Sequence, residues 1–370
     1  MKQIKNILIN LICMVCLSCL MSCVKEIDLE SLRPDPTLVV NCVAITGEPL
    51  TVSVSRTWFF TDDHPNVTLD KAEVKLFVNG IFRERMSFQE GDEVFNTRGY
   101  FKSDFIPVEG DRIRVEASYP EYGVANAETV VPEPVQVLKA GVTYVTAAGS
   151  TGSHLNAIYQ VTFKDNPSEE NYYLLRMEEG VPIFDGIAKE YTGEYKWYPV
   201  TPNYATEPVF GQSLTALDQI FGNNWMFGDG GKVFSDELIN GQEYTLHLTD
   251  EYYYEFQYGA YPIKIVPDSM WIDDFSEEDL LPIPSMHLRV HLHAISAEYY
   301  RYLKVLQDKD TGSISNLLID GGLAEPIRVF SNIDGGIGIL GSCNVGVFET
   351  EIESSSHSDL KTARFEDGID

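Results

Sequence analysis

The segment Ala72-Glu-Val-Lys-Leu-Phe-Val-Asn-Gly80 decides the fold class. Apolar and polar residues alternate from Ala72 to Leu76, which is the period of a β-strand with one buried face, and two further strand-forming residues extend the run to Val78. Asn79-Gly80 follows at once, and this dipeptide favours a two-residue hairpin turn because both positions tolerate a positive φ. The sequence therefore predicts a β-hairpin whose return strand runs over residues 81–88.

Further strand-like segments lie on both sides of this hairpin, at residues 37–43, 50–56, 111–117 and 124–131. Several short strands within about one hundred residues are typical of an immunoglobulin-like β-sandwich. We therefore expect an N-terminal sandwich over residues 37–133. It ends at Val131-Pro-Glu-Pro-Val135, because two prolines interrupt strand pairing and favour an extended connector.

A second β-rich domain is predicted over residues 134–350, with strand-like segments at residues 157–163, 172–177, 244–249 and 286–293. One helix is expected near residues 296–310, because Ser296 is a favourable N-cap and Glu298 complements the helix dipole. The predicted fold is mostly β, with two sandwich-like domains and one prominent helix in the C-terminal domain. Residues 351–370 are expected to form a flexible tail.

Composition excludes two classes of protein. Hydrophobic residues are 44% of the chain and aromatic residues 12%, which is enough for a folded core and argues against disorder. The formal net charge of −29 opposes contact with a phosphate backbone, so we expect no nucleic-acid partner. Cys42 and Cys343 lie in the predicted domains, and the sequence leaves open whether they pair or remain two buried thiols.

The first 23 residues have the anatomy of a bacterial lipoprotein signal. Two lysines precede an apolar stretch over residues 7–20, which is too short to span a bilayer stably. Leu20-Met-Ser-Cys23 then has the form of a lipobox. We therefore expect a cleaved signal peptide over residues 1–22 and acyl lipid such as palmitate on Cys23.

An acidic tether is expected over residues 23–36, between the lipid and the sandwich. Its start, Val24-Lys-Glu-Ile-Asp-Leu-Glu30, resembles the surface-export signal of Bacteroidetes lipoproteins. The resemblance implies a lipid-anchored protein of the outer membrane that is exposed at the cell surface. The residues of this segment do not determine which leaflet of the membrane carries the lipid anchor.

Three elements of the second domain resemble one family when taken in order. They are Phe234-Ser-Asp-Glu-Leu-Ile-Asn-Gly-Gln-Glu-Tyr244, Ile295-Ser-Ala-Glu-Tyr-Tyr-Arg-Tyr-Leu303 and Ser331-Asn-Ile-Asp-Gly-Gly-Ile-Gly-Ile339. Together with the lipobox and the sandwich pattern, they make the chain similar to domain-of-unknown-function family 4249, found in Bacteroidetes lipoproteins. The resemblance transfers no catalytic residue. Because members often accompany TonB-dependent receptors, it implies an accessory or binding role.

Residues 250–284 are the leading candidate for a ligand-binding segment. Their aromatic residues stand beside acidic ones, and those we single out are Tyr252, Tyr253, Tyr254, Tyr258 and Trp271. Tyr and Trp bury large areas at low entropic cost, which suits stacking on a sugar, another ligand or a partner protein. Extra strands whose aromatic side chains complete the core explain the same pattern equally well. Asp268-Ser269-Met270 resembles a Bacteroidetes O-glycosylation tripeptide, so Ser269 is a candidate for modification.

His287, Arg289, His291 and His293 recur with a period of two, which places them on one face of a strand. A metal site would need three donors converging at about 2 Å, whereas residues two apart on a strand are separated by about 6.5 to 7 Å. This geometry favours a polar outer face of the sheet over a metal site. We expect no metal and no cofactor.

The sequence contains neither Gly-x-Ser-x-Gly nor His-Glu-x-x-His. The leading hypothesis is therefore a non-enzymatic, lipid-anchored binding protein of the outer membrane, with a glycan or peptide ligand. Its expected partner is a TonB-dependent receptor that takes up nutrients. One alternative is a surface hydrolase that cleaves glycans through paired carboxylates, which have no fixed sequence spacing. Another is a structural or adhesive surface protein.

Overall fold

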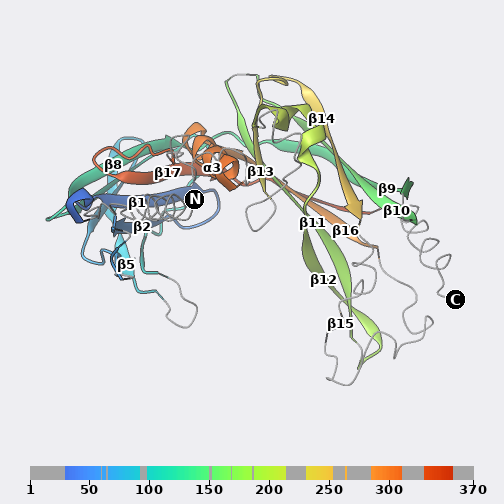
Figure 1. The fold of residues 1–370 in the computed structure, drawn as a ribbon, viewed down its shortest axis with the longest axis horizontal. Coiled ribbons are helices and arrows are strands. Elements are labelled where there is room, and N and C mark those ends of the chain that lie inside the picture. The colour runs from blue at the N-terminus through green and yellow to red at the C-terminus, as the bar shows by residue number, and fades with distance from the viewer. Residues whose placement is uncertain are drawn as a thin grey trace, which may run out of the picture. The chain divides into compact units, whose positions relative to one another are not determined.

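The structure is a computed structural model. It describes residues 30–59, 61–63, 66–91, 98–149, 152–167, 169–185, 187–213, 231–252, 263–264, 285–310 and 329–352. The chain divides into two compact units, Met1–Pro36 with Trp58–Pro65, and Thr37–Thr57 with Asn66–Asp370. The described part of the first unit includes a short 3-10 helix, η1 (Glu30–Leu32). All described strands belong to the second unit (Figure 1).

The N-terminal part of the second unit is a sandwich of two sheets. Its strands are β1 (Leu38–Ile45), β2 (Thr51–Arg56), β3 (Glu73–Val78), β4 (Ile81–Arg85), β5 (Ser87–Gln89), β6 (Tyr100–Lys102), β7 (Arg112–Tyr119) and β8 (Gly123–Val130). One sheet has the order β4-β3-β7-β8, and β1-β2-β6-β5 is one end of a longer sheet. Alternate residues of both sheets, among them Val40, Val54, Leu76 and Ile113, share one core. The mostly β, sandwich-like prediction is confirmed.

The predicted hairpin forms at Asn79-Gly80, where φ is 54° and 79° respectively. Its return strand differs from the prediction, because the chain divides near Met86. β4 pairs with β3, whereas β5 pairs with β6 in the other sheet. The segment predicted as one strand therefore contributes to both layers of the sandwich.

The C-terminal part of the second unit holds a second core. Its elements are β9 (Gln136–Gly149), β10 (Gly152–Lys164), β11 (Tyr172–Asp185), β12 (Glu190–Val200), η2 (Tyr204–Thr206), η3 (Pro208–Ser213), β13 (Lys232–Ser235), β14 (Glu243–Tyr252), β15 (Ile263–Lys264), β16 (His287–Ile295), α3 (Ala297–Asp310), β17 (Ile337–Asn344) and β18 (Val347–Glu351). β14-β10-β9 form one sheet, and the longer sheet continues as β12-β11-β16-β17-β1. Tyr159 and Phe163 of β10 share the core with Met177 and Val290 of the longer sheet.

β17 and β18 follow one another along the same edge of β16. β17 pairs with β16 at Ala294↔Asn344, and β18 keeps the same register at His291↔Val347. β17 also pairs in parallel with β1, and its Leu340 lies in the N-terminal core. One strand therefore joins the N-terminal sheet to the C-terminal sheet.

The glycine-rich segment before β17 approaches neighbouring backbone closely. At Gly335, where φ is 74°, a β-carbon would lie 2.2 Å from the carbonyl oxygen of Val124. The neighbouring Asn332 side chain both donates to and accepts from the backbone of Leu340, at 2.8 and 3.0 Å. It thereby takes the place of a neighbouring strand at this point of β17.

The predicted helix is confirmed as α3. The Ser296 hydroxyl accepts a hydrogen bond from the backbone N–H of Tyr299 at 3.3 Å, as an N-cap does. Tyr299, Tyr300 and Leu303 pack against a small apolar cluster that includes Ile295 and Cys343. No helix in the described ranges is long and apolar enough to cross a membrane.

The sequence left open whether Cys42 and Cys343 pair. In the structure both thiols are free and buried. Cys42 lies in the N-terminal core, and Cys343 lies in the cluster beneath α3. Burial raises the pKa of each thiol to about 12. Both residues therefore act as small apolar core residues in this fold.

Candidate functional site

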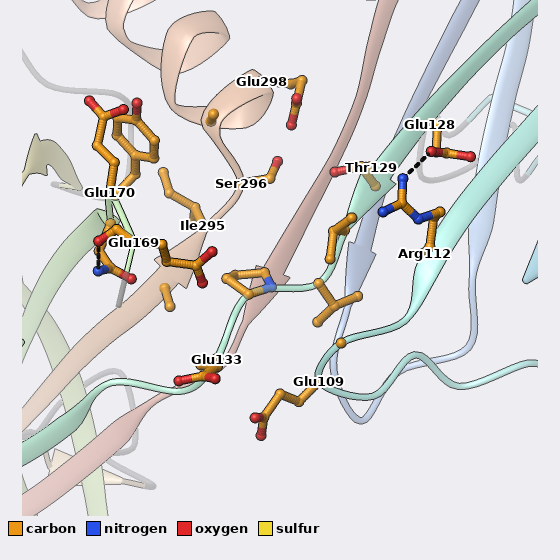
Figure 2. Close-up of a pocket in the computed structure, with 18 residues that line it drawn as sticks. Glu109, Arg112, Glu128, Thr129, Glu133, Glu169, Glu170, Ile295, Ser296 and Glu298 are labelled. Atoms are coloured by element: carbon orange, nitrogen blue, oxygen red, sulfur yellow. Dashed lines mark hydrogen bonds and ion pairs between the residues drawn. The ribbon is translucent and has the colours of Figure 1, made fainter. Parts of the chain in front are cut away.

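A cleft of about 500 Å³ lies where the end of the N-terminal sandwich, the start of β11 and the junction of β16 with α3 come together (Figure 2). Six glutamates line it: Glu109, Glu128, Glu133, Glu169, Glu170 and Glu298. We call this site the acidic cleft. Its volume lies within the range of small-ligand pockets, about 300 to 1,000 Å³.

A chain of buried hydroxyl groups ties the elements around the acidic cleft together. Thr129 of β8 lies 3.2 Å from the hydroxyl of Ser342, which donates to the carbonyl of Val130 at 2.7 Å. The backbone N–H of Ser342 in turn donates to the N-cap hydroxyl of Ser296 at 3.2 Å. The end of β8, β17 and the start of α3 are therefore positioned by interactions that leave their hydroxyl groups satisfied.

Most of the charge in the acidic cleft is uncompensated by its own lining. Arg112 is the lining cation, and it pairs with Glu128 at 2.7 Å, as the dashed line in Figure 2 shows. Burial and the neighbouring Glu170 raise the pKa of Tyr172 to about 12, so its hydroxyl remains a donor. The cleft can therefore hold cationic or hydroxyl-rich groups and repels anions. Among the described residues no group of His, Cys, Asp and Glu is arranged to hold a metal ion.

The histidine strand, β16, has the one-sided arrangement that its sequence predicts. His287 Nδ1 lies 2.9 Å from Glu349 Oε1 of β18, and His291 Nε2 lies 2.9 Å from Glu178 Oε2 of β11. Arg289, between them, donates to Glu349 at 2.9 and 3.1 Å. These partners make the face a network of ion pairs between neighbouring strands, which agrees with a polar outer face.

An aromatic ring from β12 completes this face. The guanidinium carbon of Arg289 lies 3.5 Å from the ring centre of Trp197. A β-carbon at Gly180, directly across from Trp197 in the register, would lie 2.8 Å from the same ring. The Trp197 ring thus packs over Gly180 and makes a cation–π contact with Arg289. Burial tends to raise the pKa of Glu349, but hydrogen bonds from His287 and Arg289 outweigh it and leave the pKa lowered.

His293 differs from the other members of the strand because it is buried. Its Nδ1 accepts a hydrogen bond from the backbone N–H of Gly346 at 3.2 Å, in the break between β17 and β18. Burial, with the charges of His291 and Arg176, lowers the pKa of His293 to about 4. A neutral His293 therefore holds the backbone between β17 and β18 in place.

Several buried carboxylates have structural partners that the sequence did not reveal. Tyr159 donates to Glu179 at 2.7 Å, and Tyr173 donates to Asp165. Asp165 also accepts from the backbone N–H of Gly241, in the Gly-Gln-x-Tyr element, at 2.6 Å. These acids hold β-strands and turns together inside the second core. The fold brings donor and acceptor together over separations of 8 residues for Tyr173 and Asp165 and 76 residues for Gly241 and Asp165.

The residues singled out from the sequence for lipidation, binding and modification lie outside this description. Cys23 and the signal peptide precede residue 30, and Tyr253, Tyr254, Tyr258, Ser269 and Trp271 fall between residues 252 and 285 in undescribed positions. Tyr252 ends β14, but only its backbone is described. These assignments stay predictions. The glutamates of the acidic cleft were missed because 56 acidic residues offer no pattern that distinguishes them.

Comparison with known proteins identifies the family. The family model described as "Domain of unknown function (DUF4249)" matches residues 24–349, and the chain belongs to this family. No curated protein matches the chain. A solved structure titled "Biofilm associated protein - B domain" is aligned over 86% of this chain and 87% of its own, with 6% identity and a TM-score of 0.17. A similarity of that size carries no argument about fold or function.

Proposed function

We propose that this chain is a lipid-anchored binding protein of a Bacteroidetes outer membrane, exposed at the cell surface, that works with a TonB-dependent receptor in nutrient uptake. The observation that carries the proposal is the position of the family match. It begins at residue 24, directly after the lipobox cysteine, Cys23. The family region is therefore the part of the chain that removal of a lipoprotein signal would leave behind.

The anchor in this proposal has to be the acyl lipid. The chain carries a formal net charge of −29, so anionic membrane surfaces repel it. Each buried acyl CH₂ contributes about 0.8 kcal/mol, and two or more chains give stable attachment. Lipidation of Cys23 would supply that attachment without any membrane-spanning segment.

A binding role accounts for the described side chains better than a catalytic one. The buried carboxylates Asp165 and Glu179 are engaged by tyrosine hydroxyls within the core, away from any substrate. The acidic cleft offers space and charge for a ligand. Its lining contains no histidine, cysteine or lysine, and its glutamates are the groups through which the alternative glycan hydrolase would act. Of the glycan and peptide ligands expected, the cleft favours uncharged or basic ones and disfavours anionic ones.

The first experiment separates the anchor from the rest of the proposal. Cells that produce the chain are fed a radiolabelled or clickable palmitate, and the Cys23→Ser variant serves as the matched control. We expect label on the wild-type chain in the outer membrane and none on the variant, which should leave the membrane fraction. Protease treatment of intact cells should degrade the wild-type chain. Label at another position, or an unlabelled wild-type chain, would refute the anchor.

The second experiment addresses the aromatic segment at residues 250–284. The proposal expects a receptor that co-purifies with the wild-type chain and is lost when this segment is deleted. Circular dichroism of the deletion variant controls for misfolding. Retention of the receptor by a folded deletion variant would move the contact elsewhere on the chain.

A further inference from the structure

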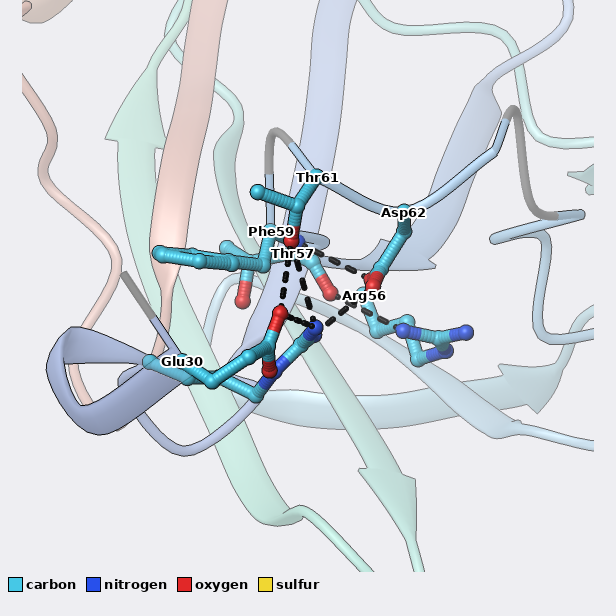
Figure 3. A network of polar contacts seen from close by, with 7 residues as sticks. Glu30, Arg56, Thr57, Phe59, Thr61 and Asp62 are labelled. Carbon is cyan, nitrogen blue, oxygen red and sulfur yellow. Dashed lines mark hydrogen bonds and ion pairs between the residues drawn. The ribbon is translucent and has the colours of Figure 1, made fainter. Parts of the chain in front are cut away.

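The loop that begins at Trp58 is fastened to the end of the tether (Figure 3). Arg33 is the centre of this network. Its guanidinium donates to Glu30 at 2.8 and 3.0 Å and pairs with Asp62 of the loop at 2.8 Å. Thr61 adds a hydrogen bond from its hydroxyl to Glu30 at 2.9 Å. Two segments that are almost thirty residues apart are thus joined by Arg33 and by the hydrogen bond from Thr61 to Glu30.

The loop carries one exposed aromatic side chain, Trp58, next to a half-buried one, Phe59. Trp58 is 47% exposed, which is unusual for so large an apolar side chain. Phe59 lies beneath the Arg33 guanidinium, whose carbon is 4.8 Å from the ring centre. The backbone of Phe59 exchanges hydrogen bonds with Asp62, at 2.9 and 3.2 Å, so the loop has a defined turn.

This aromatic pair is held close to the proposed lipid. Six residues separate Cys23 from Glu30, and an extended chain of that length spans at most about 25 Å. Acyl chains on Cys23 would therefore hold Glu30 within that distance of the bilayer, with Trp58 and Phe59 on the loop that is bonded to the same end of the tether. The interface of a bilayer is the region where Trp is enriched, because one side of its ring system is apolar and the other can donate a hydrogen bond.

We propose that Trp58 and Phe59 form a second membrane contact, which inserts into the lipid surface that holds the Cys23 acyl chains. The proposal rests on the proposed lipidation. The contact is apolar, and Arg33 offers little attraction to anionic lipid because its charge is shared between Glu30 and Asp62. Its function is to orient the first unit at the membrane, while the acyl chains supply the affinity.

The test uses the lipidated full chain in vesicles of phosphatidylcholine whose acyl chains carry bromine, a short-range quencher of tryptophan. The chain has four tryptophans, so Trp58→Phe isolates the signal of Trp58 by difference. We expect Trp58 emission to be quenched and blue-shifted in these vesicles, and equally so in low and high salt. Arg33→Gln, which removes the ion pair with Asp62 and leaves the Thr61–Glu30 hydrogen bond as the remaining link, should reduce the quenching at least twofold.

Arg85→Gln is the matched control, because Arg85 is also an exposed arginine paired with a glutamate, at 3.0 Å from Glu73. It should leave Trp58 quenching unchanged. If mass spectrometry finds the lipid on Cys23 but Trp58 emission is unaffected by brominated lipid, the membrane contact is refuted and the anchor stands. If Cys23 carries no lipid, the proposed function and this inference fail together.

Discussion

Gly338 of β17 lies so close to Val40 of β1 that a β-carbon on the glycine would be 2.1 Å from the Val40 carbonyl oxygen. The two residues are partners in the parallel register that joins the C-terminal strand to the N-terminal sheet. The φ of Gly338 is 118°, which residues with a side chain rarely adopt. Both steric contact and backbone conformation therefore require glycine at this joint.

Gly338→Ala should lower the free energy of unfolding by at least about 2 kcal/mol, because the strand must shift away from β1 to make room. Gly141→Ala is the control, since nothing lies within 4 Å of a β-carbon at Gly141. It should change the stability by less than about 1 kcal/mol. Urea denaturation of both variants measures the difference, and equal effects would contradict the close approach.

The lowered pKa of His293 predicts that the folded chain loses stability in mild acid. Its pKa is about 4 in the folded chain and 6.5 without burial, so between these pH values the unfolded chain binds a proton that the folded chain does not. The stabilising contribution is complete above about pH 6.5 and is lost as the pH falls towards 4, by up to about 3 kcal/mol. His293→Asn keeps an acceptor for Gly346 and should flatten this dependence in denaturation curves from pH 4 to 7.

His247→Asn is the control for that series, because the His247 side chain is exposed. It should leave the slope of stability against pH as in the wild-type chain. A wild-type slope that survives in the His293→Asn variant would show that other groups cause the acid sensitivity.

The pair of Arg289 and Trp197 should show a measurable coupling energy. A double-mutant cycle with Arg289→Gln and Trp197→Leu is expected to give about 0.5 to 1.5 kcal/mol, since the stacked cation is partly shielded from water. Lys196 and Tyr198, whose ammonium and ring centre are 5.1 Å apart, form the control pair and should couple more weakly. Equal coupling in the two pairs would contradict the assigned role of Trp197.

The cysteines should be unreactive in the folded protein. Burial raises the pKa of Cys42 and of Cys343 to about 12, so little thiolate exists at neutral pH. A thiol reagent such as Ellman's should react slowly with the native, processed chain and should titrate two thiols after unfolding without reductant. A chain that yields no thiols when unfolded would instead contain a disulfide.

Local patterns were sufficient to predict much of the fold. The Asn79-Gly80 turn, the alternating strands and the N-cap at Ser296 depend on neighbouring residues, and all are found where expected. The division of the return strand at Met86 was not predicted, because it depends on which sheet offers a partner. The parallel pairing of β1 with β17 likewise joins segments about three hundred residues apart.

The candidate sites show the same limit. The common face of His287, Arg289 and His291 follows from the period of a strand, but their partners Glu178 and Glu349 depend on strand order and register. The acidic cleft brings together glutamates from three distant segments, so no local motif marks it. Most of the aromatic segment falls outside the described residues, as do Cys23 and Ser269, and these assignments stay predictions.

The most direct test of the proposed function is a pull-down of the lipid-anchored chain from detergent-solubilised outer membrane, followed by mass spectrometry. The Cys23→Ser variant, secreted without lipid, is the matched control. We predict a TonB-dependent receptor in stoichiometric amount with the lipidated chain. A lipidated chain that is recovered without any partner would contradict the accessory role and would direct attention to glycan hydrolysis and adhesion.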